Sequence, residues 1–169
     1  DMKVLAFSRT VSQELVSKGV RYVSLDELLA NSDIVTLHLP HTKETEHIIN
    51  MQNIQKFKRG AVLINTARGA LVETQAIAEG LEKGILSAAG LDVLEEEAHL
   101  REEKEFLSSE YLSKVDIKTA LLNHVLLTRD DVVITPHNAF NSKEAVEEIL
   151  EITALNIKKF IEGNPQNLI

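Results

Sequence analysis

The fold of this chain is decided by residues 61–69, which read AVLINTARG, and by residues 90–93, which read GLDV. Each stretch contains a short apolar run that ends in polar or charged side chains. Working outward, further apolar runs of similar length alternate with amphipathic stretches of helical spacing. This alternation is typical of a mostly parallel sheet covered by helices on both faces. The sequence therefore predicts an α/β fold.

Six strands and several helices are predicted from this alternation. The strands are expected at Lys3–Phe7, Arg21–Val23, Ile34–Leu39, Ala61–Asn65, Ser87–Val93 and Val132–Thr135. The helices are expected at Val11–Lys18, Leu25–Ala30, Met51–Phe57, Glu73–Lys83 and Ser142–Ile161, with one or two more between Glu95 and Arg129. Ser24 and Glu27 are expected to form a capping box, and Gly84 and Gly163 are expected to end their helices.

Composition limits the classes of protein to which the chain can belong. The 169 residues are 44% hydrophobic, which is enough for the core of a single domain, and no linker-like stretch divides them. A net charge of -8 argues against nucleic-acid binding, which needs a basic face. There is no cysteine, and no apolar run reaches the roughly 18–20 residues that cross a membrane. We expect a cytoplasmic enzyme or binding domain.

Residues that can carry chemistry follow the predicted strands directly. In an open α/β sheet, ligands bind beyond the carboxyl ends of the strands. Four ionisable side chains come at or just after these ends, and they are expected to converge on one rim of the sheet: Arg9, Arg68, Asp92 and His137.

Three motifs together resemble the D-isomer-specific 2-hydroxyacid dehydrogenase family. They are NTARG at residues 65–69, GLDV at residues 90–93 and TPH at residues 135–137. The similarity runs nearly from end to end, and the long insert before His137 looks most like the D-lactate dehydrogenase branch. The resemblance implies a Rossmann-type, doubly wound parallel sheet. It also implies hydride transfer between NAD(P)H and a small 2-keto acid, such as pyruvate, to give a D-2-hydroxy acid.

The resemblance assigns a catalytic role to Arg68, Glu97 and His137. A histidine is well suited to exchange a proton near neutral pH, and His137 would protonate the keto oxygen. Glu97 would bind the other ring nitrogen of that histidine. Arg68 would hold the substrate carboxylate with two hydrogen bonds. On sequence alone Glu95 and Glu96 compete with Glu97, and only the spacing in the family selects Glu97.

The resemblance also implies a set of residues that bind the cofactor. Asp92 would orient the nicotinamide, and the full set is Ser8, Arg9, Leu39, Pro40, Thr45, Thr66, Ala67, Arg68, Asp92, His137 and Ala139. NAD enzymes usually carry an acidic residue for the ribose where this chain has Ser8. Because no carboxylate repels a 2′-phosphate there and Arg9 could pair with one, the cofactor is expected to be NAD or NADP. A solvated Arg9 is the alternative.

Two features of the complete family are missing from the sequence. None of the seven glycines has the Gly-x-Gly-x-x-Gly spacing of the phosphate-binding loop. The chain begins with Asp1, inside what corresponds to the second strand, and Lys3–Phe7 already has the pattern of a buried strand. We therefore expect an N-terminally truncated, partial NAD(P)-binding domain over residues 1–169, without the substrate domain.

Other functions stay open at this point. A fragment without activity of its own could bind the dinucleotide as a regulator or serve only subunit association. A homodimer is expected, because related enzymes pair through the cofactor domain. His38, His41 and His47 lie close together in the sequence, but they lack the spacing and the acidic or cysteine ligand of a metal site. No metal is expected.

Overall fold

The computed structural model describes residues 2–97 and 116–168. It divides into two compact units, Asp1–Pro136 and His137–Ile169. The first unit contains the strands and most of the helices, and the second contains one long helix. Within the described residues, no helix is long and apolar enough to cross a membrane.

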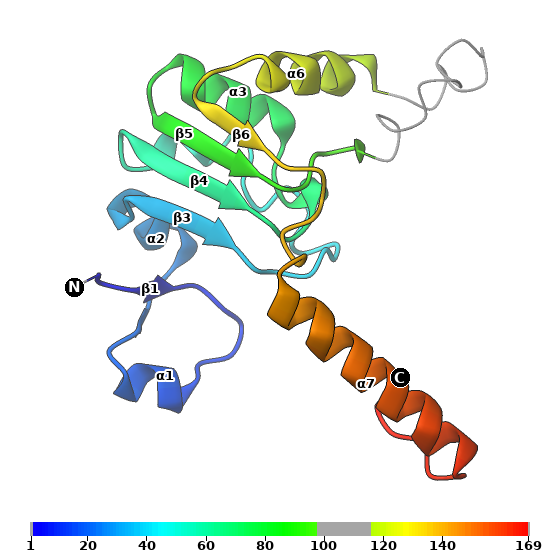
Figure 1. Ribbon diagram of the computed structural model, residues 1–169. Helices are drawn as coiled ribbons and strands as arrows, with labels where there is room; N and C mark the ends of the chain where they lie inside the picture. Colours follow the sequence, from blue (N-terminus) through cyan, green and yellow to red (C-terminus); the bar gives the residue numbers. More distant parts are fainter. Residues whose placement is uncertain (1, 98–115, 169) are drawn as a thin grey trace. The chain divides into compact units, whose positions relative to one another are not determined.

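The strands of the first unit form two parallel sheets (Figure 1). One sheet pairs β1 (Leu5–Ala6) with β2 (Arg21–Tyr22). The other has the order β3 (Ile34–Leu37), β4 (Ala61–Asn65), β5 (Leu86–Leu91) and β6 (Val132–Ile134). Every pairing is parallel. The parallel α/β sheet predicted from the sequence is therefore confirmed.

Helices connect these strands much as the sequence pattern predicts. They are α1 (Gln13–Ser17), α2 (Leu25–Asn31), α3 (Thr74–Glu82) and α6 (Ile117–Leu127), with the 3-10 turns η1 (Ile54–Lys56) and η2 (Gly69–Leu71). Half of the predicted capping box is formed: Ser24 caps α2 by accepting from the Glu27 amide at 3.2 Å, but the Glu27 side chain bonds Arg21 and not the Ser24 amide. The Glu27 side chain pairs with Arg21 at 2.5 Å. Gly84 follows α3 with a φ of 61°, a conformation that glycine adopts without strain.

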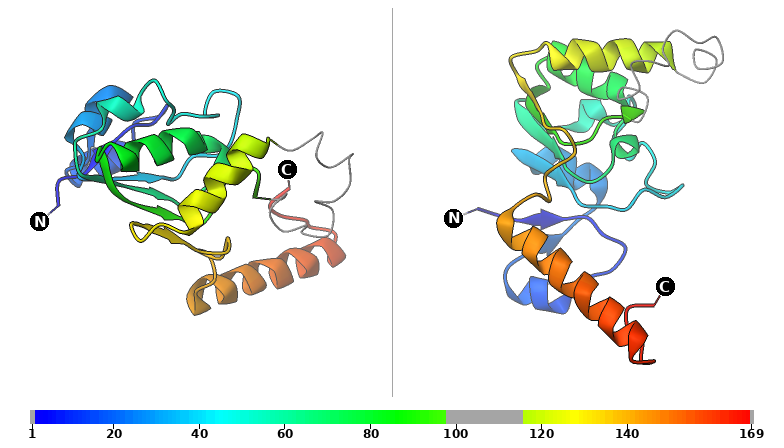
Figure 2. Two further views of the ribbon diagram at one scale, coloured as in Figure 1. Left: turned by 90° about the horizontal axis from the view of Figure 1, so that it is seen from above. Right: turned by 45° about the vertical axis from the view of Figure 1, so that its right-hand side comes forward.

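The core lies on one face of the four-stranded sheet. Along β3, Val35 and Leu37 are buried while Ile34 and Thr36 are exposed, as the two-residue period of a strand requires. The buried side chains pack with Leu29 of α2 and with residues of α3 and α6 in a single cluster. Figure 2, in the view from above, shows α3 lying along the sheet. Helix-covered apolar side chains of this kind supply most of the favourable free energy of folding.

Two local predictions are wrong in detail. Lys3–Phe7 was expected to be a buried strand, but only Leu5–Ala6 is paired, and Phe7 is 40% exposed. The reason is that β1 is bonded only to the two residues of β2. Met51–Phe57 was expected to be a helix, but only Ile54–Lys56 forms a 3-10 turn. Here the Asn50 side chain accepts from backbone amides and competes with helical hydrogen bonds.

The second unit contains α7 (Lys143–Ile161), which confirms the long helix predicted there. Ser142 caps it by accepting from the Ala145 amide at 3.2 Å, and Gly163 follows it with a φ of 73°. No residue of α7 is buried, and Figure 2 shows a continuous helix. Between Glu95 and Arg129, the predicted helical region contains α6. Residues 98–115, with His99 and the charged run at 101–105, lie outside the described residues.

Candidate active site

The carboxyl ends of four strands lie side by side in the first unit. Leu37 of β3 pairs with Asn65 of β4, Asn65 pairs with Leu91 of β5, and Leu91 pairs with Ile134 of β6. Because all four strands are parallel, the segments that follow them leave the sheet at the same edge. Predicted site residues follow the first three of these strands closely: Leu39 and Pro40 after β3, Thr66, Ala67 and Arg68 after β4, and Asp92 after β5.

The turn that carries Arg68 is held by a buried asparagine. Asn65 is 1% exposed. Its side-chain amide donates to the Arg68 carbonyl at 2.8 Å, and its side-chain oxygen accepts from the Ala67 amide at 3.1 Å. Arg68 itself is exposed, and its Nη1 donates to the Ala67 carbonyl at 2.6 Å. The backbone of this turn is therefore fixed, while the guanidinium group is accessible.

Gly69 lets the segment after β5, which contains Glu97, approach the Arg68 turn closely. A Cβ atom added to Gly69 would lie 2.0 Å from the Leu94 carbonyl oxygen and 2.6 Å from the Glu95 amide nitrogen. No side chain fits at such distances, so the peptide between Leu94 and Glu95 packs directly against the glycine. The segment that leads to Glu97 is thus brought against the residue that follows Arg68.

Asp92 joins the ends of three strands. It is 4% exposed. Its amide donates to the Asn65 carbonyl at 2.9 Å, and its Oδ1 accepts from the Thr135 hydroxyl at 2.5 Å. A buried carboxylate is stable only when it is hydrogen-bonded in this way. Asp92 is therefore held firmly at the edge of the sheet.

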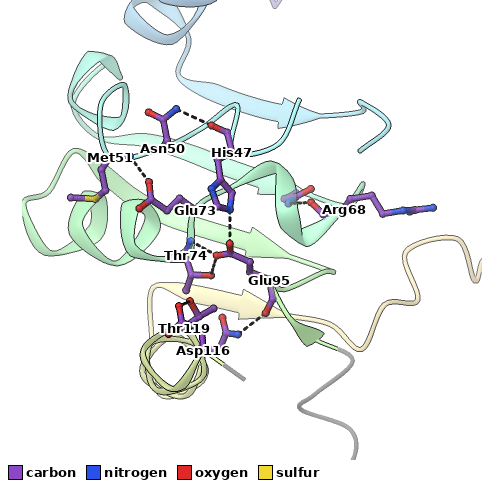
Figure 3. A network of polar contacts seen from close by, with 11 residues as sticks. His47, Asn50, Met51, Arg68, Glu73, Thr74, Glu95, Asp116 and Thr119 are labelled. Carbon is purple, nitrogen blue, oxygen red and sulfur yellow. Dashed lines mark hydrogen bonds and ion pairs between the residues drawn. The ribbon is translucent and has the colours of Figure 1, made fainter. Parts of the chain in front are cut away.

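The three acids after β5 have different partners. Both side-chain oxygens of Glu95 are bonded, Oε1 to His47 Nε2 at 2.5 Å and Oε2 to the Thr74 amide and hydroxyl at 2.9 and 2.8 Å (Figure 3). Glu96 accepts from the Asp116 amide at 3.3 Å. Glu97 is half-buried, and its Oε2 accepts from the Leu94 amide at 3.3 Å.

The loop after β3 contains three of the predicted cofactor residues. Leu39 packs against the core, and Pro40 is exposed. Thr45 closes the loop because its hydroxyl donates to the Pro40 carbonyl at 2.7 Å and accepts from the Thr42 amide at 2.8 Å. The side chain of Thr45 thus fixes the loop that Pro40 begins.

Ser8 and Arg9 follow β1 in the other sheet, and both are exposed. Ser8 accepts from the Thr10 amide at 3.4 Å. The pKa of Glu44 is lowered from its ordinary value, mainly because the Thr42 hydroxyl donates to its carboxylate, and the positive charge of Arg9 adds a smaller effect.

His137 and Ala139 belong to the second unit. His137 is half-buried and has a φ of 55°, a left-handed conformation that is uncommon for residues other than glycine. Ala139 is exposed. The Asn141 amide donates to the Asn138 carbonyl at 2.9 Å, so a tight turn leads from His137 into α7.

The histidines of the loop region do not form a cluster. His38 Nε2 lies 3.0 Å from the Thr36 hydroxyl, whereas His47 is paired with Glu95. Across the part of the chain that the structure describes, no group of three or more histidines and acids could hold a metal ion.

Sequence reasoning missed the polar network that supports these segments. It links His47, Thr74 and Glu95 (Figure 3). The buried side chain of Asn123 extends it, because its Nδ2 donates to the Glu95 carbonyl at 2.9 Å. In Figure 3 the Arg68 side chain points away from this network. The role of Asn65 could have been predicted, because an asparagine at the end of the otherwise apolar strand β4 needs hydrogen-bond partners. No local signal pairs Glu95 with His47, which is 48 residues away.

The residues at the sheet edge fit the nicotinamide end of a dinucleotide. Asp92 provides a fixed carboxylate, which suits the amide donors of a carboxamide and a cationic ring. Thr66 and Pro40 are exposed at the same edge, where an extended ligand can lie. The chain lacks the glycine spacing for the pyrophosphate. The residues at the sheet edge therefore fit the nicotinamide end of the cofactor, and the sequence has no glycine-rich loop for its pyrophosphate.

Comparison with protein families gives one match that covers most of the chain. Residues 1–139 match the model described as D-isomer specific 2-hydroxyacid dehydrogenase, NAD binding domain. The chain is 44% identical over 158 residues to a D-specific alpha-keto acid dehydrogenase of Enterococcus faecium, covering 94% of this chain and 45% of that protein. It is 35% identical over 168 residues to a hydroxypyruvate reductase of Blautia hydrogenotrophica, covering 99% and 46%.

Comparison with solved structures agrees with this match. A D-lactate dehydrogenase from Aquifex aeolicus, solved in complex with NAD and lactic acid, superposes with a TM-score of 0.82 at 40% identity. The match covers 96% of this chain and 47% of that one. The chain therefore spans less than half of the length of the proteins it resembles.

Proposed function

The chain belongs to the D-isomer specific 2-hydroxyacid dehydrogenase family, as its NAD-binding domain, and on that basis we propose that the full-length protein transfers a hydride between NAD(P)H and a small 2-keto acid. The substrate is of the pyruvate/D-lactate type. The observation that carries the proposal is the packing of the Leu94–Glu95 peptide against Gly69. This contact supports a common site for the segments that carry Arg68 and Glu97.

Arg68 binds the substrate in this proposal. A planar guanidinium group can make two parallel hydrogen bonds to a carboxylate. The exposed side chain and the fixed backbone of Arg68 suit that role, because the turn is held by Asn65 while the guanidinium group faces solvent. The positive charge also stabilises the negative charge that develops on the keto oxygen.

His137 is the proposed acid and base. In the direction of reduction it donates a proton to the substrate oxygen, and in oxidation it takes that proton back. Glu97 is its proposed acidic partner, which selects one tautomer of the ring. The nicotinamide, when bound, supplies or accepts the hydride. These roles come from the family motif.

Most of the proposed cofactor contacts belong to the first unit, and His137 and Ala139 belong to the second. Asp92 holds the carboxamide, with Thr66 and Ala67 beside it. The loop after β3 contributes three further cofactor contacts, Leu39, Pro40 and Thr45. The family motif also assigns Arg68, His137 and Ala139 to the cofactor. Ser8 and Arg9 lie where the adenosine ribose is expected, and the absence of an acid there supports NADP as well as NAD. We propose that residues 1–169 act together as an NAD(P)-binding domain.

Oxidation of NADH and of NADPH by the full-length protein, with pyruvate and a series of longer 2-keto acids, tests the function. The proposal predicts turnover with at least one of these acids. The alternative is a dinucleotide-binding regulatory or subunit-association fragment, for which titration would detect binding without turnover. Light scattering tests the expected homodimer. The cytoplasmic location remains a prediction, which cell fractionation tests.

A further inference from the structure

Glu95 connects three segments of the first unit through its side chain. Its Oε1 lies 2.5 Å from Nε2 of His47, in the loop after β3, and its Oε2 accepts from both the amide and the hydroxyl of Thr74, at the start of α3 (Figure 3). The side chain of Glu95 is only 16% exposed. Because a carboxylate forms stronger hydrogen bonds than a neutral acceptor, this partly buried group ties the three segments firmly.

Each of these segments is joined to a predicted part of the active site. The His47 amide donates to the Ala70 carbonyl at 2.8 Å, two residues beyond Arg68. Thr74 begins the helix that follows the same turn. The backbone of Glu95 packs on Gly69, and its carbonyl accepts from the buried Asn123 of α6 at 2.9 Å. Glu95 therefore joins the segment that contains Glu97, of which it is a part, to the Arg68 turn.

We propose that Glu95 is a positioning residue that sets the location of Glu97 relative to Arg68. This inference rests on the proposed function, in which Arg68 and Glu97 belong to one active site. Glu95 does not act as the acid itself, because both of its oxygens are engaged by His47 and Thr74. Its hydrogen bonds instead hold the turn from Leu94 to Glu97, in which the Leu94 amide donates to Glu97 Oε2 and the Glu97 amide to the Leu94 carbonyl, both at 3.3 Å.

Loss of the Glu95 side chain should reduce catalysis more than cofactor binding. A displacement of about 1 Å in a reacting group can lower the rate on the order of 100-fold. Asp92, the proposed nicotinamide contact, is held separately by Asn65 and Thr135. We therefore expect Glu95→Ala to lower kcat by roughly 10- to 100-fold while KM for the dinucleotide changes less than about threefold. Glu95→Gln retains an acceptor for Thr74 and should restore most of kcat.

The experiment compares these two variants with Glu79→Gln in the full-length protein. Glu79 is a matched control because its side chain is 26% exposed and accepts from Lys83 and Gln55, but it lies on α3 away from the Arg68 turn. We expect wild-type kinetics for this control. Hydrogen exchange of the Leu94 and Glu97 amides, measured in the same proteins, gives a readout that does not depend on activity.

The outcomes separate the two proposals. Faster exchange at Leu94 and Glu97 together with a lower kcat in Glu95→Ala supports the positioning role. Unchanged exchange, or faster exchange with wild-type kcat, overturns it and leaves Glu95 as a residue of structural importance only. If Glu95→Ala does not fold, a Glu95→Gln variant with kcat as low as that of an Arg68→Ala variant contradicts the inference. An inactive wild-type protein refutes the proposed function, whatever the exchange result.

Discussion

A Cβ atom on Gly69 would lie 2.0 Å from the carbonyl oxygen of Leu94. This close approach joins two sequence motifs that are more than twenty residues apart, since Gly69 follows Arg68 and Leu94 precedes the acids that include Glu97. The glycine is thus required by a contact between backbones, and its own φ is not positive.

Gly69→Ala should destabilise the protein by at least about 1–3 kcal/mol, the usual cost of an overpacked site. The methyl group has no free space, so the backbone at Leu94 must move. Chemical denaturation measures the loss. Gly90→Ala is the control, because a Cβ there would lie 3.8 Å from the Ile64 side chain, an ordinary contact. Equal stabilities for the two variants would show that the Leu94 peptide does not require a glycine at position 69.

Asn65→Leu should cost about 1–3 kcal/mol, because it leaves the Arg68 carbonyl and the Ala67 amide without their buried partner. The substitution should also raise KM for the 2-keto acid, since the Arg68 turn loses its support. Asn31→Ala, which removes an exposed amide that donates to the Glu27 carbonyl, should change stability by less than about 0.5 kcal/mol. A KM for Asn65→Leu equal to that of the wild type would argue against the supporting role.

Asp131 should make stability depend on pH in the acidic range. Arg129 donates to it through Nε and Nη2, both at 2.7 Å, and this lowers the pKa of Asp131 from its ordinary value. A lowered pKa in the folded state means that the pair stabilises the protein above the ordinary aspartate pKa of about 3.9. That stability is lost as the pH falls through the lower, folded value.

Asp131→Asn should therefore be less stable than the wild type at neutral pH by up to about 1 kcal/mol, because the pair is partly exposed. The difference should shrink as the pH falls through the lowered pKa of Asp131 in the folded state, because the wild-type carboxylate is then protonated as well. Denaturation at several pH values measures this trend. Asp33→Asn is the control, as its pair with Lys58 is far more exposed. A difference that grows at low pH would contradict the assignment.

Ser8→Asp should shift cofactor use towards NADH. A carboxylate at the end of β1 repels a 2′-phosphate, so KM for NADPH is expected to rise on the order of tenfold, equivalent to about 1.4 kcal/mol. KM for NADH should stay the same or fall. Thr10→Asp, two residues further along the same exposed loop, should have a smaller effect. A wild-type protein that uses NADH alone would contradict the NADP part of the proposal.

Much of the fold could be predicted because its signals are local. Ala61–Asn65 is a strand as predicted, and Ser24 and Gly84 mark helix ends by their own hydrogen bonding and backbone conformation. The burial of Lys3–Phe7 could not be predicted, because it depends on which strands pair with β1.

The candidate site likewise has one part that the sequence predicts and another that it does not. The position of Arg68 at a strand end follows from the pattern of β4. The different partners of Glu95, Glu96 and Glu97 do not, because an acidic run carries no local sign of what each side chain meets. The pair between Glu95 and His47 spans 48 residues and exists only in the folded chain.

His137 is the proposed proton donor of a 2-keto acid reductase. The most direct test of this role is the rate of pyruvate-dependent NADH oxidation by the full-length protein and by a His137→Ala variant. General acid catalysis typically contributes about 10²–10⁴-fold, so kcat of the variant should fall by that factor while the variant stays folded. Turnover by His137→Ala at the wild-type rate would show that His137 is not the proton donor.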